Sequence, residues 1–308
     1  MKVLLTGIEY FANQIQHAVQ ECDSDFSFSR ISVKSPRWPI AAITLMRKRT
    51  IDLWYHVGGY HTWGVNLPMT SVAARYNVRS VIHWAGTDVL TVSAAKFRGF
   101  FRHTVVATHW AGAPWLKEEL SAFCVDDVLY VPFPLSEVAK ACSGTAKPFP
   151  SKMVVLSYAS SQSRATFYGY DTIHRLAKSF PGIEFRIAGI FRPADIVELP
   201  NVHFLGWRKD MTPLYEDSVL ILRIVPHDGF SGMVQEALAH GRYVIWKYDV
   251  PGVVSATDYH DIHTAIHSFY VRFRAQQLPL NGEGRTFVSQ HLSQDRIGNE
   301  IVRRLRSV

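Results

Sequence analysis

Short runs of β-branched and other apolar residues alternate along the whole chain with longer segments in which apolar residues recur at helical spacing. This alternation is typical of α/β proteins, in which a helix connects each parallel strand to the next. Strands buried on both faces of a sheet should be continuously apolar, and Val81-Ile82 and Val105-Val106-Ala107 have that character. The sequence therefore predicts parallel sheets covered by helices.

The same pattern occurs in both halves of the chain. In the first half we expect strands near 2–6, 27–33, 52–57, 79–84, 104–108 and 128–132, and helices near 10–21, 39–49, 66–76 and 110–121. In the second half we expect strands near 153–158, 183–188, 202–205, 219–225 and 242–247, and helices near 169–179, 211–217, 231–240, 261–274 and 294–306.

One segment without periodicity separates the two halves. Residues 143–152 are rich in Gly, Pro and Ser, the composition of a linker. We predict two Rossmann-like domains, at 1–146 and 152–290, and a C-terminal helix over 291–308 that could pack back on the first domain. Ligands of parallel sheets bind at the carboxyl ends of the strands, so two such domains should face each other across a cleft. This architecture suits a nucleotide or nucleotide sugar, and also periplasmic-type binding proteins and some epimerases.

The chain carries a formal net charge of +7 and has a pI near 9.3. Such a surface favours anionic partners, although a basic surface without a dedicated partner is equally compatible. Bases end an apolar helix at 47–49 and mix with aromatic residues over 96–103. Both segments could contact anionic lipid or nucleic acid, or could be solvated bases above core aromatics.

The cysteine content and the hydropathy of the sequence indicate the cellular compartment. The three cysteines, Cys22, Cys124 and Cys142, form no C-x-x-C pair, which fits a reducing environment. The apolar run over 1–7 is too short for a signal peptide, and no stretch approaches the length that spans a bilayer. We expect a cytoplasmic protein with an option of peripheral membrane contact.

Two groups of possible metal ligands occur, at Asp23-Ser24-Asp25 and at 258–263 with His267. The first fits a solvent-exposed turn, and Asp and His are also ordinary near the start of a helix such as the one predicted after Asp258. No Walker loop, G-x-G-x-x-G or G-x-S-x-G motif is present. We expect neither a metal nor a cofactor.

The most informative segment runs from Arg223 to Gly241, where a strand, a loop of small residues and a helix follow one another. Backbone amides at a helix N-terminus bind phosphate, and glycines let the phosphate approach closely. The segment is thus a candidate diphosphate cradle. Its loop and first helical residues are Gly229, Phe230, Ser231 and Gly232.

Two carboxylates flank this cradle. Glu236, one helical turn deeper, could accept hydrogen bonds from ribose hydroxyls, and Asp228 could hold sugar hydroxyls near the anomeric carbon. The alternative is a plain strand–turn–helix in which Asp228 caps the helix.

This segment resembles the E-x7-E signature of retaining family 4 glycosyltransferases of the GT-B fold. It reads Asp228-x7-Glu236, followed by Ala237-Leu238-Ala239-His240-Gly241. Other pieces follow in the family's order. They are 81–88 (similar to an H-G-x-D turn), 128–132, 183–189, 202–207 (similar to a turn whose backbone contacts the base, here Gly206 and Trp207) and 210–219.

The sequence departs from the family pattern on the donor side. The first Glu of the signature is Asp228, and Tyr168 stands where a phosphate-binding Lys is expected. Arg164 is the nearest cation and Arg223 a second candidate for contacting phosphate, with a solvated surface role as the alternative for each.

It also departs on the acceptor side. Ala85 occupies the place of the family's His, and His83 lies two residues earlier on the same face of the predicted strand, either as a substitute or as a buried histidine. The usual Gly-Gly after the first strand is replaced by 6–10. We expect Gly58, Gly59 and Asp88 on the acceptor side.

The resemblance implies transfer of a sugar from a nucleotide-diphosphate sugar to an acceptor hydroxyl, with retention and without metal. The first domain would bind the acceptor and the second the donor, with Asp228, His83 and Arg164 at the reacting centre. The acceptor could be a glycan, a lipid-linked sugar or a modified base in DNA. The alternatives are a nucleotide-sugar-binding module that has lost activity and a nucleotide-sugar epimerase.

Overall fold

The computed structural model describes residues 1–59, 69–91, 107–123, 125–193 and 197–308. The basic and aromatic segment 96–103, Cys124 and parts of the elements predicted at 66–76 and 104–108 lie outside the described residues. The chain forms two compact units. The first comprises Met1–Ser136, His227–Phe230 and Leu292–Val308, and the second comprises Glu137–Pro226 and Ser231–His291.

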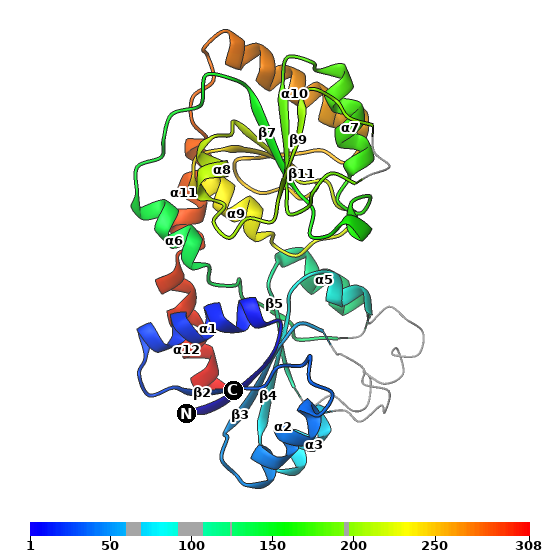
Figure 1. The fold of residues 1–308 in the computed structure, drawn as a ribbon. Coiled ribbons are helices and arrows are strands. Elements are labelled where there is room, and N and C mark those ends of the chain that lie inside the picture. The colour runs from blue at the N-terminus through cyan, green and yellow to red at the C-terminus, as the bar shows by residue number, and fades with distance from the viewer. Residues whose placement is uncertain (60–68, 92–106, 124, 194–196) are drawn as a thin grey trace. The chain divides into compact units, whose positions relative to one another are not determined.

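The first unit is a parallel sheet in the order β2-β1-β3-β4-β5-β6, with helices on both faces (Figure 1). Its strands are β1 (Lys2–Gly7), β2 (Ser27–Arg30), β3 (Leu53–Val57), β4 (Arg79–Trp84), β5 (Thr108–Ala111) and β6 (Leu129–Tyr130). Its helices are α1 (Glu9–Cys22), α2 (Trp38–Arg47), α3 (Met69–Arg75), the 3₁₀ helix η1 (Thr87–Thr91), α5 (Pro114–Ala122) and α12 (Gln294–Ser307).

The C-terminal helix packs against the first helix of the same unit. Helix α12 turns Ile297, Ile301 and Leu305 inward and lies beside α1 (Figure 1). The two backbones approach so closely that a Cβ on Gly298 would come within 2.8 Å of the Ala18 carbonyl oxygen. The chain's last helix is therefore part of the first unit's core, although it follows the second unit in sequence.

The second unit repeats the architecture with the strand order β12-β11-β10-β7-β8-β9, all parallel. Its strands are β7 (Val154–Tyr158), β8 (Glu184–Ala188), β9 (Val202–Gly206), β10 (Leu220–Leu222), β11 (Tyr243–Trp246) and β12 (Val253–Ser255). Its helices are α6 (Ser136–Ser143), the 3₁₀ helix η2 (Gln162–Arg164), α7 (Tyr170–Ser179), α8 (Thr212–Glu216), α9 (Gly232–Ala239), α10 (Tyr259–Arg274) and α11 (Gly282–His291).

The predicted α/β class with two parallel, Rossmann-like sheets is confirmed. Besides the 3₁₀ helices η1 and η2, three of the described elements were not predicted, namely α6, β12 and α11. The compact units divide the chain at Ser136, whereas the sequence places the linker at 143–152, which lies within the second unit. Among the described helices, none combines the length and the apolar character that crossing a bilayer requires.

Candidate functional site

The polar features of the second unit gather where its strands end. Strands β7 and β10 are parallel neighbours, so their carboxyl ends lie at one edge of the sheet. Tyr158 ends β7, and Arg223 follows the last residue of β10 directly. This edge is where a parallel sheet offers unpaired backbone groups and loops to a ligand.

Two guanidinium groups lie near the ring of Tyr168. The Cζ atom of Arg164 is 5.3 Å from the ring centroid, and that of Arg223 is 5.0 Å from it. Arg164 is exposed and also lies 4.4 Å from the Phe167 ring centroid, whereas the tyrosine is buried. Arg164 and Arg223, which sequence reasoning proposed separately, are thus brought together by the residue that replaces the expected Lys.

The turn that presents Tyr168 is fixed by a glycine. Gly169 has φ +71°, and a Cβ there would come within 2.5 Å of the Ile224 side chain. The turn before α7 therefore contacts the segment that leaves β10. The ring of Tyr158 meets that of Tyr168 edge-on at 6.0 Å, and burial raises the pKa of the Tyr158 hydroxyl.

Helix α9 begins in the same unit, after the loop that follows β10. Ser231 is its N-cap residue and is buried, and Gly232 is its first residue. The first amides of a helix have no carbonyl one turn earlier to bond, and they carry partial positive charge. The predicted cradle residues Ser231 and Gly232 therefore stand at an N-terminus that can bind an anion.

Glu236 lies one turn into α9 and is partly buried. Burial raises the pKa of its carboxyl group to about 7, although a hydrogen bond with the Tyr215 side chain acts in the opposite direction and lowers the pKa. The group is therefore poised between its neutral and ionised forms near neutral pH. A ribose diol would hydrogen-bond best to the ionised form, which accepts two bonds.

Two exposed aromatic rings follow the neighbouring strands of this unit. Trp207, directly after β9, is 69% exposed, and Phe191, after β8, is 73% exposed. Gly206 has φ +66°, and a Cβ there would come within 2.6 Å of the Phe191 ring. Sequence reasoning proposed Gly206 and Trp207 but missed Phe191. Its signal was a large aromatic residue placed just after a predicted strand.

The loop His227–Phe230, which carries Asp228, belongs to the first unit. The Trp115 indole N–H donates to the Asp228 carbonyl oxygen at 2.8 Å, and His227 Nε2 lies 2.7 Å from Glu119 Oε2. A Cβ on Gly229 would come within 1.8 Å of the Ala85 carbonyl oxygen, so only glycine fits there. Phe230 is buried beside Trp115, with 5.9 Å between ring centroids.

The catalytic role predicted for His83 does not fit the structure. Its side chain is fully buried, Nε2 bonds the Val131 carbonyl oxygen at 2.7 Å, and Nδ1 bonds the Tyr55 hydroxyl at 2.8 Å. Burial lowers its pKa to about 3. Both ring nitrogens are therefore occupied, and His83 is the satisfied core histidine that the sequence left as the alternative.

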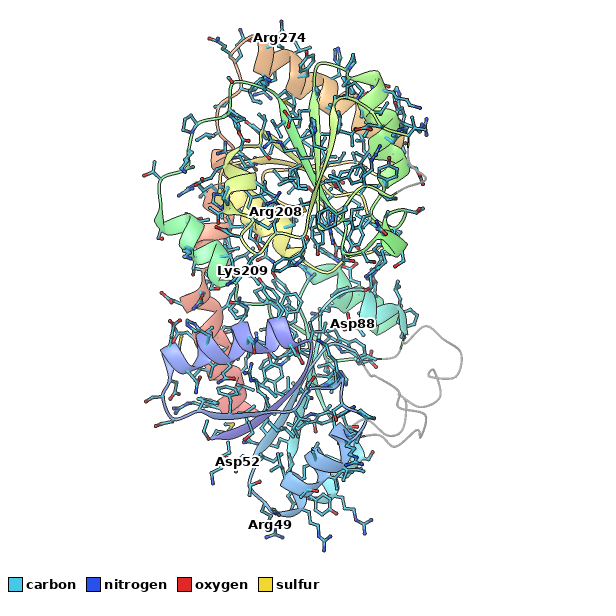
Figure 2. All side chains as sticks on the ribbon, in the orientation of Figure 1. Arg49, Asp52, Asp88, Arg208, Lys209 and Arg274 are labelled. Atoms are coloured by element: carbon cyan, nitrogen blue, oxygen red, sulfur yellow. The ribbon has the colours of Figure 1, made fainter. Side chains whose placement is uncertain are left out.

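The three predicted acceptor-side residues lie together after β3 and β4. A Cβ on Gly59 would come within 3.0 Å of the Asp88 Cβ, and Gly58 has φ +99°. Asp88 accepts hydrogen bonds from the Ala85 amide at 3.0 Å and from the Gly86 amide (Figure 2 marks Asp88). Burial raises the pKa of the Asp88 carboxyl group, although the hydrogen bonds from these backbone amides act to lower it. Asp88 thus holds the turn against which Gly229 packs.

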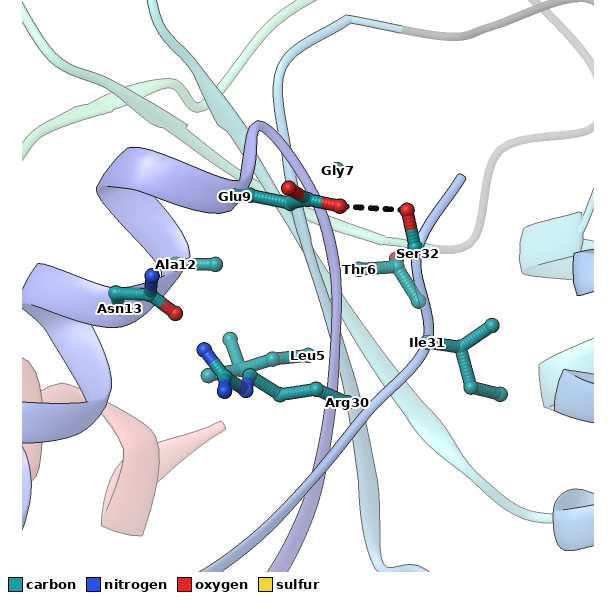
Figure 3. A pocket seen from close by; sticks show the side chains of 9 residues that line it. All are labelled: Leu5, Thr6, Gly7, Glu9, Ala12, Asn13, Arg30, Ile31 and Ser32. Atoms are coloured by element: carbon teal, nitrogen blue, oxygen red, sulfur yellow. Dashed lines mark hydrogen bonds between the residues drawn. The ribbon is translucent and has the colours of Figure 1, made fainter. Parts of the chain in front are cut away.

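A pocket of about 270 Å³ opens in the first unit at the carboxyl ends of β1 and β2 (Figure 3). Its polar lining includes Glu9, Asn13, Arg30 and Ser32. The Ser32 hydroxyl donates to Glu9 Oε1 at 2.5 Å, which together with Lys34 at 3.5 Å lowers the pKa of the Glu9 carboxyl group. Sequence reasoning missed this pocket, although charged residues at the ends of predicted strands and at a helix start were visible.

The described residues contain no group of three His, Cys, Asp or Glu side chains arranged to hold a metal ion. The Asp and His residues at 258–267 belong instead to the N-cap and first turns of α10, where the Asp258 carboxylate accepts the Asp261 amide at 2.8 Å.

No protein-family model matches the sequence, and no curated protein matches it. The structure, however, is similar to solved structures along its whole length. Sucrose-phosphate synthase from Thermosynechococcus elongatus matches with a TM-score of 0.71 and 11% identity, covering 100% of this chain and 98% of that one. An alpha-glucosyltransferase in complex with UDP matches with a TM-score of 0.63 and 12% identity, covering 98% of both chains.

A UDP-GlcNAc 2-epimerase from Neisseria meningitidis bound to UDP-GlcNAc matches with a TM-score of 0.58 and 13% identity, covering 100% of both chains. The chain therefore has the GT-B fold, as predicted. The same fold occurs in transferases and in this epimerase.

Because the pKa of Glu236 is raised in the folded state, the stability of the fold should depend on pH. Its folded-state pKa of about 7 exceeds the usual 4.5, so the folded state binds the proton more tightly than the unfolded state. Its carboxyl group therefore favours folding at low pH, and that contribution is lost as pH rises from about 4.5 to about 7. Glu236→Gln should raise the free energy of unfolding at pH 8 by up to about 3 kcal/mol, and by less at pH 5.5.

Chemical denaturation at the two pH values measures this difference. Glu283→Gln, which changes an exposed carboxylate in the first turn of α11, is the matched control and should show little change at either pH. An equal effect of Glu236→Gln at both pH values would contradict the assignment.

Proposed function

We propose that this protein is a glycosyltransferase that takes its sugar from a nucleotide-diphosphate donor held by the second unit. The proposal rests on one observation: the guanidinium groups of Arg164 and Arg223 both lie near the ring of Tyr168. The N-terminus of α9 belongs to the same unit. Two guanidinium groups and a set of helix amides are suited to a diphosphate, since both supply donors to phosphate oxygens.

The same groups suit the chemical step. When the glycosidic bond of the donor breaks, negative charge builds on the departing nucleotide diphosphate. Guanidinium groups and helix amides that are already in place stabilise that charge without reorganisation. In this proposal they take the role that a metal ion plays in other transferases. Retention of configuration, with Asp228 contacting the transferred sugar, belongs to the proposal through the family resemblance.

The rest of the nucleotide has partners in the same unit. The exposed rings of Phe191 and Trp207 offer faces on which a nucleobase can stack. The ionised carboxylate of Glu236 would accept hydrogen bonds from the ribose hydroxyls. This division assigns the base, the ribose and the diphosphate to separate side chains of the second unit.

We place the acceptor in the pocket of the first unit. An ionised carboxylate, an amide, a guanidinium and a hydroxyl line it, and such groups hydrogen-bond sugar hydroxyls. Its volume of about 270 Å³ lies just below the ~300 Å³ at which drug-sized sites begin, so it suits a group as small as one sugar ring. A glycan or the sugar of a lipid-linked acceptor fits this chemistry better than a stacked DNA base, because no aromatic side chain among the described residues lines the pocket.

An epimerase acting on a nucleotide sugar is the second candidate, because the fold is shared with an epimerase bound to UDP-GlcNAc. An epimerase needs no acceptor and releases an altered nucleotide sugar. The polar pocket in the first unit favours the transferase.

A thermal-shift screen against nucleotide sugars tests the donor site. One donor should raise the melting temperature of the wild type. Arg164→Ala and Arg223→Ala should each weaken its binding about 10- to 100-fold, the effect of losing a charge-assisted hydrogen bond. Tyr168→Ala should also weaken binding, because it removes the ring that lies near both guanidinium groups. Tyr168→Phe should bind as the wild type does, because it keeps the ring.

Arg175→Ala is the matched control for the donor site, since Arg175 is an exposed arginine of the same unit whose Cζ lies 4.0 Å from the Tyr259 ring centroid. It should leave donor binding unchanged. If no nucleotide sugar raises the melting temperature of the wild type, the proposed function is wrong.

Acceptor kinetics test the pocket once a donor is known. Asn13→Ala and Arg30→Ala should raise the acceptor KM about tenfold each, the effect of losing one hydrogen bond, and should leave the donor-induced thermal shift intact. Gln20→Ala, on the exposed part of α1, is the control and should change neither quantity. An unchanged acceptor KM in both pocket variants would place the acceptor elsewhere. Altered nucleotide sugar formed without acceptor would favour the epimerase.

A further inference from the structure

One stretch of the first unit is strongly and uniformly basic. Residues 26–51 contain six basic side chains and no acidic one. All six are exposed, and they occur on both sides of α2, at Arg30, Lys34, Arg37, Arg47, Lys48 and Arg49. Arg49, which follows α2, lies at the rim of the first unit (Figure 2). Apart from Arg30, which lines the proposed acceptor pocket, these bases lie outside the proposed donor and acceptor sites.

The outward face of α2 has a regular order. Its exposed residues recur at helical spacing. Basic residues stand at both ends and less polar residues form the centre, in the order Arg37, Ile40, Ala41, Thr44, Arg47 and Lys48. The opposite face is buried through Trp38, Ala42 and Met46. The exposed residues thus form one continuous stripe, which we call the α2 stripe.

The centre of the α2 stripe presents an apolar surface to the solvent. Ile40 is 67% exposed, an unusual state for an isoleucine. The only hydroxyl in the centre, that of Thr44, donates to the Ile40 carbonyl oxygen at 2.8 Å within the same helix. The centre therefore presents carbon atoms to the solvent, with its one polar hydrogen already bonded.

The stability of the helix does not account for these bases. Arg37 is the N-cap residue and makes no side-chain capping bond, and a cation at a helix N-terminus is unfavourable. Within the described residues, Arg37, Arg47 and Lys48 form no ion pair, whereas the neighbouring Lys34 lies 3.5 Å from Glu9. The bases are therefore available to an external partner.

We propose that the α2 stripe is a docking surface for an anionic lipid bilayer. Bases at both ends match the negative headgroups, and the apolar centre with Ile40 can enter the boundary between headgroups and acyl chains. A nucleic acid would also attract the bases, but it favours aromatic side chains for stacking. The aromatic residue of this helix, Trp38, is buried. The helix lies on the surface and does not cross the membrane.

Vesicle flotation tests the proposal with the full-length chain and with neither nucleotide nor sugar, so its result is independent of the proposed function. The wild type should bind vesicles of phosphatidylcholine with 30% phosphatidylglycerol and not vesicles of phosphatidylcholine alone, and added salt should weaken binding. Arg47→Gln with Lys48→Gln should reduce partitioning about 30-fold. Ile40→Asp should reduce it about tenfold.

Val271→Asp is the matched control, because Val271 is 52% exposed beside Arg272 on α10 of the second unit. It should bind vesicles as the wild type does, and melting temperatures should confirm that all variants fold. Failure of the wild type to bind the anionic vesicles would overturn the proposal. The proposal would also be overturned if both α2 variants bound the anionic vesicles as tightly as the wild type does. The same holds if the protein bound duplex DNA through the α2 bases and did not bind the vesicles.

Discussion

The constraint on which this structure depends is the burial of parallel strands on both faces. Strands such as β3 and β4 have almost no exposed surface, and their backbone groups are bonded to neighbouring strands. Polar groups that reach a ligand therefore come from the last residues of the strands and from the residues just beyond the strand ends. Arg223 after β10, Trp207 after β9 and the pocket at the ends of β1 and β2 all follow this rule.

Two guanidinium groups lie near the ring of Tyr168 in the proposed donor site. The resemblance to GT-B transferases leads one to expect a Lys at this position, and a buried tyrosine cannot supply positive charge. Its ring instead lies within 5.0 to 5.3 Å of two guanidinium carbons, one from η2 and one from the end of β10. The sequence already proposed Arg223 as a second candidate for contacting phosphate, and the structure adds that it lies near the same ring as Arg164.

The fold could be predicted from the sequence because helical and strand periodicities are local. The short exposed strand β12 escaped detection, since its three residues show neither burial nor alternation. The site was predicted less completely. The family resemblance and strand alternation proposed His83 for the reacting centre, with a buried histidine as the alternative. Its hydrogen-bond partners are Tyr55 and Val131, distant positions whose contacts are set by tertiary packing. The pocket beside Glu9 depends likewise on contacts between separate elements.

In the proposed function, the second unit recognises the diphosphate of a nucleotide. Isothermal titration calorimetry with nucleoside diphosphates and the matching nucleosides tests it directly, because each pair differs only in the phosphates. For the base that the protein selects, the diphosphate should bind about 100-fold or more tightly than the nucleoside. Equal affinities for the two, or no binding by any nucleoside diphosphate, would contradict it.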